Sequence, residues 1–247
     1  MKRVMLTVAY DGTNYHGWQI QPNVITIESV LNEKLSELFK EEIKVIGASR
    51  TDTGVHALGN IAVFDTNARM PAEKVSYALN QRLPEDIRIQ ASKEVPLDFH
   101  PRRQNSKKTY EYKILNTEFP MPVHRLYAHF TYVPLDISLM QQAADYLVGE
   151  HDFKSFCSVN TVAETTVRTI YDIKVDKLND MISIKVTGSG FLYNMVRIIA
   201  GTLMEAGRGN LEPSEIPGIL DALDRTKAGP TAPACGLTLV SYSYDCN

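Results

Sequence analysis

The chain has 247 residues, of which 44% are hydrophobic and 22% are charged, the balance of an ordinary globular protein. That is enough apolar material for one large domain or two modest ones without disulfides. The 26 Lys and Arg residues are outnumbered by 29 Asp and Glu residues, which gives a net charge of −3. This total excludes a uniformly basic coat, the simplest sign of a nucleic-acid binder, but it leaves room for a local basic groove.

The three cysteines are widely spaced. Cys157, Cys235 and Cys246 form no CxxC pair and no Cys/His cluster with metal-binding spacing, so we expect no metal site and predict reduced thiols in a cytosolic protein. The N-terminus, MKRVMLTVAYDG, lacks the apolar core of a signal peptide. The most apolar stretch, 191–204, is interrupted by polar residues and is shorter than the ~20 residues of a membrane span. We therefore expect a cytoplasmic protein with no membrane contact.

Hydrophobic periodicity divides the first half of the chain into strands and helices. The predicted elements are a strand over 3–10, a helix from Thr26, strands over 43–48 and 60–64, a helix near Pro71 and a strand over 87–91. The second half repeats this order. Its predicted elements are a strand over 108–115, a helix over 138–148, strands over 169–175 and 181–186 joined by a turn at Asn179-Asp180, a helix over 191–205 and a strand over 237–244.

Strand, helix, two strands, helix, strand is the split βαβ pattern of the ferredoxin-like fold. The sequence therefore predicts an α+β protein of two ferredoxin-like lobes, 1–100 and 101–247, with a linker around 94–107. We expect the lobes to form a continuous, mostly antiparallel sheet with helices on one face and an active-site cleft between the lobes.

The loop between the predicted strands at 43–48 and 60–64 is longer than the two to five residues that a hairpin needs. It carries Arg50, Asp52 and His56 together. One interpretation is a solvated loop with an Asx-type turn before its glycine. The other is a carboxylate on a rigid loop between buried strands, a suitable place for a nucleophile or base.

A basic run precedes two tyrosines at strand spacing, in the sequence HPRRQNSKKTYEY from His100 to Tyr112. Such a run is often only a solvated face. Basic residues interleaved with aromatic ones also suit RNA phosphates and an unstacked base. Arg168 is a candidate to extend this surface.

Arg197 lies in an otherwise apolar helix, which we expect to be buried on most faces. A guanidinium there is unfavourable unless a carboxylate pairs with it. That pair could be structural, or it could keep a catalytic carboxylate ionised, and both can hold together.

These stretches together resemble the tRNA pseudouridine synthase A family, over essentially the whole chain and in the family's order. The similar segments are the nucleophile loop RTDTGVHA at 50–57, the tyrosine strand KTYEY at 108–112, and the arginine helix with Gly190-Phe191-Leu192, Met195-Val196-Arg197 and Gly201. The terminal motifs are Tyr10-Asp11-Gly12 with Gly17-Trp18-Gln19, and GPTAP at 229–233 with Gly236-Leu237. Ser49 stands where the family often has Gly, and Asn60 where Gln is common.

The resemblance implies isomerisation of uridine to pseudouridine at positions 38, 39 and 40 of the tRNA anticodon stem-loop. It implies no cofactor and no metal, and a homodimer in which one tRNA contacts both subunits. The implied catalytic residues are Asp52, Tyr110 and Arg197. The implied substrate-binding residues are Tyr110, Arg50, His56, Arg102, Arg103, Lys107, Lys108 and Arg168.

Two other classes of protein compete with this interpretation. A non-catalytic tRNA- or RNA-binding protein would explain the tyrosines and the basic run, but gives no reason for Asp52 and a buried Arg197. A hydrolase using Asp52 and His56 is disfavoured because the chain has no Ser or Cys nucleophile motif.

Overall fold

The computed structural model describes residues 1–158 and 163–244, and its chain divides into two compact units. Unit 1 comprises residues 1–105 and the chain from Leu239 onward, and unit 2 comprises 106–238. The sequence places the boundary near residue 100 and the whole last strand in the second lobe. The structure differs because Tyr242 and Tyr244 of that strand pack in unit 1, against a cluster that includes Met5.

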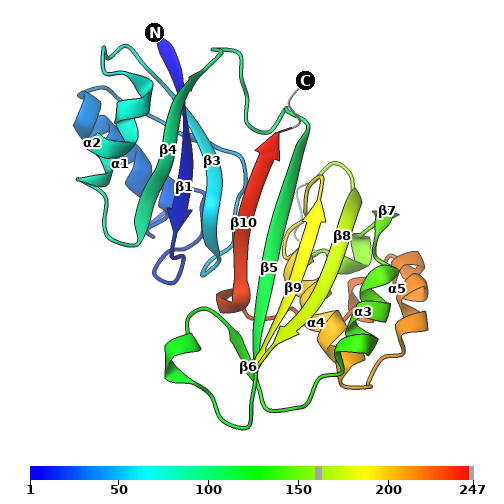
Figure 1. Cartoon of the computed structure of the whole chain (residues 1–247). Helices are drawn as coiled ribbons and strands as arrows, with labels where there is room; N and C mark the ends of the chain where they lie inside the picture. The colour runs from blue at the N-terminus through cyan, green and yellow to red at the C-terminus, as the bar shows by residue number, and fades with distance from the viewer. Residues whose placement is uncertain (159–162, 245–247) are drawn as a thin grey trace. The chain divides into compact units, whose positions relative to one another are not determined.

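Unit 1 has the split βαβ order (Figure 1). Its elements are β1 (Lys2–Tyr10), α1 (Ile27–Phe39), β2 (Ile46–Gly47), β3 (His56–Thr66), α2 (Val75–Asn80) and β4 (Ile87–Val95). The sheet order is β4-β1-β3, β2 also pairs with β3, and these pairings are antiparallel. The last strand, β10 (Leu237–Tyr244), follows β3 in this order.

The two faces of the unit 1 sheet are both covered. Val4 of β1 is fully buried and lies opposite Phe64 of β3, whose ring is 5.7 Å from Phe39 of α1. The helices α1 and α2 lie on this face (Figure 1). Helix α1 begins after Thr26, whose side chain accepts from Ser29 N–H in a capping box. On the other face, Met5, Ile61 and Val63 form a second cluster.

Unit 2 repeats the pattern with additions. Its elements are β5 (Ser106–Asn116), β6 (His129–Thr131), α3 (Ile137–Asp145), β7 (Gly149–Asp152), β8 (Val167–Leu178), β9 (Met181–Gly188), α4 (Met195–Gly207) and α5 (Ile216–Ala222). The sheet order is β5-β9-β8-β7, with antiparallel pairing, and β6 joins β5 in parallel. Helices α3, α4 and α5 lie together on one side of these strands (Figure 1).

The α+β class and the repeated element order are confirmed, as is the hairpin turn after β8, where Asn179 has a positive φ of 52°. Three details differ. Strand β2 has only two residues, and β3 starts at His56 instead of 60. Helix α4 starts at Met195 instead of 191, because Asn194 has a left-handed backbone, φ 60°, that a helix cannot include. Strands β6 and β7 and helix α5 were not predicted. The cleft between the lobes stays a prediction.

Across residues 1–158 and 163–244, no helix combines the length and the apolar character that crossing a membrane requires. In the same ranges, no three His, Cys, Asp or Glu side chains cluster so that they could hold a metal ion. Among the described residues, Cys157 and Cys235 form no disulfide, and Cys246 lies outside the described residues.

Candidate active site

Asp52 is half-buried on a tight turn of unit 1 between β2 and β3. Its carbonyl oxygen accepts a hydrogen bond from Val55 N–H at 3.1 Å, and Gly54 adopts a positive φ of 76°. This closes the turn over four residues and fixes the backbone that carries the carboxylate. The structure therefore gives Asp52 a rigid base next to two sheet strands.

The N-terminal motif packs directly against this turn. A Cβ on Gly12 would lie 2.0 Å from the carbonyl oxygen of Val55, so only glycine fits there. A Cβ on Gly17, whose φ is 82°, would lie 2.6 Å from the carbonyl oxygen of Thr51, and Trp18 N–H donates to that oxygen at 3.0 Å. The two glycines let the chain approach the turn from both sides of Asp52.

His56 is buried inside unit 1, with 5% of its surface exposed. Its Nδ1 lies 3.1 Å from Gly12 N–H and 3.1 Å from a carboxylate oxygen of Asp11. Gly12 N–H donates to this Nδ1, so the histidine binds the backbone of the N-terminal motif. The ring therefore links the N-terminal motif to the start of β3, and a contact between His56 and the substrate stays a prediction.

The cations of unit 1 gather beside the Asp52 loop. Arg102 Nε donates to the carbonyl oxygen of Gly47 at 2.7 Å, at the point where the loop leaves β2. Burial, followed by the charge of Arg50, lowers the pKa of Arg102, and burial together with Arg103 and Arg102 lowers the pKa of His100. Arg50 and Arg103 are exposed. A bound phosphate would stabilise these neighbouring positive charges, because it would accept charge-assisted hydrogen bonds from the guanidinium groups.

Tyr110 lies in the middle of β5 in unit 2, opposite Val186 of β9. Its ring is 8% exposed and meets Phe191 edge-to-face, with 5.3 Å between ring centroids and planes at 87°. A Cβ on Gly188 would lie 3.1 Å from the Phe191 ring, so glycine leaves room for this contact. Tyr110 is thus an aromatic side chain fixed in one orientation.

Arg197 lies in the first turn of α4. Every residue of this helix except Arg197 and Glu205 is buried. The predicted burial of this helix is therefore confirmed. Arg197 Nη1 donates to Asn194 Oδ1 at 2.9 Å, and Arg197 Nε donates to the carbonyl oxygen of Ala232 at 2.7 Å. These two acceptors orient the guanidinium.

The GPTAP segment reaches Arg197 by crossing α4 at close range. A Cβ on Gly201 would lie 1.8 Å from the carbonyl oxygen of Pro230, and a Cβ on Gly229 would lie 2.7 Å from Thr202 Cα. Gly229 N–H donates to Thr202 Oγ1 at 2.9 Å, and Tyr112 OH donates to the carbonyl oxygen of Pro233 at 2.9 Å. The segment is anchored at both ends, so Ala232 is a fixed acceptor for the arginine.

We expect Gly201→Ala to lower the free energy of unfolding by at least ~1–3 kcal/mol, because the new methyl must displace the segment that crosses α4. Gly218→Ala in α5 is the matched control. A Cβ there meets nothing within 4 Å, so we expect a small gain from the better helix former. Urea denaturation of both variants measures this, and equal stabilities would contradict the close crossing.

The remaining predicted cations lie on unit 2. Lys107 Nζ sits 5.5 Å from the ring centroid of Tyr171, and Lys108 is half-buried. Arg168 Nη1 donates to the carbonyl oxygen of Thr165 at 2.9 Å, and burial lowers the pKa of Arg168. Its stem passes within 3.9 Å of the Cβ position of Gly190.

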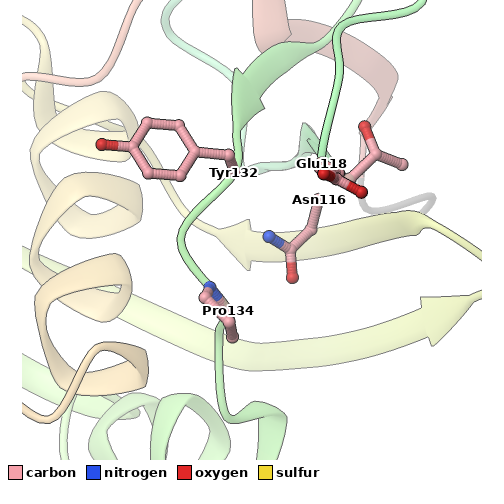
Figure 2. Close-up of a pocket in the computed structure, with 5 residues that line it drawn as sticks. Asn116, Glu118, Tyr132 and Pro134 are labelled. Atoms are coloured by element: carbon pink, nitrogen blue, oxygen red, sulfur yellow. The ribbon is translucent and has the colours of Figure 1, made fainter.

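Unit 2 also has a small pocket of about 330 Å³ beyond the end of β5 (Figure 2). Asn116, Thr117, Glu118, Tyr132 and Pro134 line it. The Asn116 amide already donates to the carbonyl oxygens of Thr131 and Val133. None of the predicted site residues lines this pocket, so it is not the candidate active site.

Within unit 1 the structure thus places Arg102 against the start of the Asp52 loop, with Arg50 close enough to lower its pKa, and it buries His56 at the other end of the loop. Unit 2 holds Tyr110 and Arg197. Sequence reasoning missed the two acceptors of Arg197. The available signals were Asn194, an asparagine at a helix start, and the GPTAP motif.

A family model described as tRNA pseudouridine synthase matches residues 6–102 and 143–245. The tRNA pseudouridine synthase A of Ruminiclostridium cellulolyticum is 51% identical over 245 residues, covering 99% of this chain and 100% of that protein. The tRNA pseudouridine synthase A of Thermoanaerobacter sp. (strain X514) is 49% identical over 244 residues, with the same coverage. A solved chain titled "Crystal Structure of a Cbf5-Nop10-Gar1 Complex" is 12% identical, with a TM-score of 0.36 over 82% of this chain and 54% of that one, too low to add to these matches. On the family model and the full-length relatives, the chain belongs to the tRNA pseudouridine synthase family.

Proposed function

We propose that this chain is an isomerase that converts uridine to pseudouridine at positions 38, 39 and 40 of the tRNA anticodon stem-loop. Family membership supports the reaction, and the resemblance of the motifs supports the positions. The single observation that carries the proposal is the placement of Asp52, on a turn held on one side by Gly12 and on the other by Trp18.

The reaction rearranges one nucleotide without gaining or losing atoms. The N1–C1′ bond of uridine breaks, the uracil rotates, and a C5–C1′ bond forms. The C5 proton leaves and N1 acquires a proton, so no oxidant or phosphate donor is needed. Asp52 serves as the anion, by attack on C1′, by attack on C6, or by removal of the C2′ proton to give a glycal.

In this proposal Tyr110 and Arg197 assist Asp52. Arg197 is a cation whose orientation Asn194 and Ala232 fix in advance, and a preorganised charge stabilises an anion more than a mobile one does. Tyr110 stacks on the extruded uracil. Extruding a stacked base requires a few kcal/mol, and stacking on an aromatic ring returns about 1–3 kcal/mol.

The predicted cations are proposed to contact tRNA phosphates, with Arg50, Arg102 and Arg103 on unit 1 and Lys107, Lys108 and Arg168 on unit 2. We expect Arg103→Ala to weaken tRNA binding and to reduce the slope of log K against log salt by about 0.7–0.9, the value for one lost phosphate contact. Lys93→Ala, an exposed cation of β4, is the control and should leave the slope unchanged. Equal slopes for the wild type, Arg103→Ala and Lys93→Ala would contradict a contact between Arg103 and a tRNA phosphate.

We further propose a cytoplasmic homodimer that needs no metal and no cofactor, as the family resemblance implies. Light scattering of the purified protein, alone and with tRNA, tests the dimer.

Incubation of the protein with unmodified tRNA labelled with tritium at C5 of uridine tests the proposed function. We expect stoichiometric tritium release and pseudouridine at positions 38, 39 or 40. Tight tRNA binding without tritium release would favour the non-catalytic RNA-binding alternative. Release of free uracil would instead indicate hydrolysis.

A further inference from the structure

A buried polar network lies behind the Asp52 loop, and the proposed chemistry does not use it. The Tyr10 hydroxyl lies 2.7 Å from Thr51 Oγ1, and Asn60 Nδ2 donates to the Tyr10 hydroxyl at 3.3 Å. All three side chains are buried, Asn60 completely. Burial raises the pKa of Tyr10, so its hydroxyl stays protonated and can donate.

The same asparagine also holds the loop backbone two residues before Thr51. Asn60 Oδ1 accepts from Ser49 N–H at 3.2 Å, and Asn60 Nδ2 donates to the carbonyl oxygen of Ser49 at 3.0 Å. One amide thereby satisfies both backbone groups of Ser49, as a neighbouring strand would. Strand β2 ends at Gly47, so Ser49 lies beyond the strand, and the Asn60 side chain supplies these backbone hydrogen bonds.

Thr51 is fixed from two directions. Its hydroxyl meets Tyr10, and its carbonyl oxygen accepts from Trp18 N–H. The Tyr10 and Trp18 rings lie against each other, with 5.9 Å between centroids. Ser49 and Thr51 are therefore anchored on the N-terminal side of Asp52, while the 52–55 turn anchors the other side.

Apolar side chains could fill this interior without any hydrogen bonds to satisfy. A buried polar group left without a partner lowers the stability of the fold by about 1–3 kcal/mol. What a satisfied network adds is a single arrangement of the backbone it binds. Its bonds tie Ser49 and Thr51, the loop residues that lead into Asp52, to Tyr10 of β1 and Asn60 of β3. One further bond, from Ile61 N–H to Asn60 Oδ1 at 2.9 Å, holds the asparagine to its own strand.

We infer that Tyr10, Thr51 and Asn60 are positioning residues that hold the Asp52 carboxylate in the orientation it needs toward the uridine ribose or base. The inference rests on the proposed function. A reacting group misplaced by about 1 Å can lose on the order of 10²-fold in rate, so the network should act on kcat and not on tRNA affinity.

Tyr10→Phe removes one hydroxyl and keeps the ring. With unmodified tRNA as substrate, we expect kcat to fall ~10- to 100-fold and KM to stay within about twofold. Tyr15→Phe is the matched control, because it removes a partly buried hydroxyl that donates to Asp86 at 2.6 Å and keeps the Tyr15 carbonyl oxygen that accepts from Gly54 N–H. It should lower the Tm by a similar amount and leave kcat unchanged.

A second pair of variants keeps the inference testable if Tyr10→Phe does not fold. Thr51→Ser retains the hydroxyl and should keep most of kcat, whereas Thr51→Val keeps the shape without the hydroxyl and should lose kcat as Tyr10→Phe does. The double variant Tyr10→Phe/Thr51→Val should lose no more kcat than either single variant, because both substitutions remove the same hydrogen bond.

A folded Tyr10→Phe enzyme with wild-type kcat, an equal loss in Tyr15→Phe, or additive losses in the double variant would each overturn the positioning role. Absence of tritium release by the wild-type protein would overturn the proposed function instead. The two failures are thus separated by the wild-type measurement.

Discussion

We expect Asp52→Asn to abolish pseudouridine formation, with kcat lowered by ~10⁴-fold or more, because each of the proposed routes needs an anion at this position. The fold should survive. The turn uses the backbone oxygen of residue 52, which asparagine retains, and asparagine is itself a good turn residue. Tritium release from C5-labelled tRNA measures the turnover, and filter binding should give a tRNA affinity close to that of the wild type.

Asp52→Glu separates charge from geometry. It keeps the carboxylate but moves it by one methylene, and on a turn clamped on both sides we expect a large loss of kcat as well. Asp176→Asn, an exposed carboxylate of β8, controls for the loss of a negative charge and should retain full activity. Turnover above one-tenth of wild type in Asp52→Asn would exclude Asp52 as the nucleophile or base.

Arg197→Lys should lower kcat by ~10²- to 10³-fold, the range seen when one preorganised electrostatic group is removed. Lysine carries the same charge, but its ammonium cannot reproduce the planar guanidinium that donates from Nε to Ala232 and from Nη1 to Asn194. The positive charge would remain, but the two hydrogen bonds that fix its position would not both form. Steady-state kinetics with unmodified tRNA measures the effect.

Arg208→Lys is the matched control on the same helix. Arg208 follows α4 and pairs with Glu205 at 2.6 Å, an interaction that lysine can also make. We expect its kcat to equal that of the wild type. If Arg197→Lys also kept full activity and lost only stability, the arginine would be purely structural.

Local patterns were sufficient for most of the fold. The 3.6-residue periodicity of α1 and the alternation of β1 predict elements close to those observed, because each depends mainly on its own residues. The burial of α4 around Arg197 could likewise be read from its nearly continuous apolar sequence. Strand β6 was missed because three residues are too few to show a period.

The candidate site was predictable in its residue types but not in its contacts. Asp52 and Arg197 stand out from sequence because a charged residue between apolar segments is unusual. The bond from Arg197 to Ala232 and the bonds from Asn60 to Ser49 join residues 35 and 11 positions apart. Such pairs depend on how the elements fold onto each other, which no local pattern encodes.

The close crossings at Gly12 and Gly201 also decide how a survey of every substitution in this chain should be interpreted. Neither residue has a reactive group, yet any side chain at either position would meet a backbone oxygen within 2.0 Å or less. Scored by activity alone, both positions would rank beside Asp52 and Arg197 among the intolerant sites. Scored by the amount of folded protein, the glycines should separate from the catalytic residues, since only the glycine variants would be depleted.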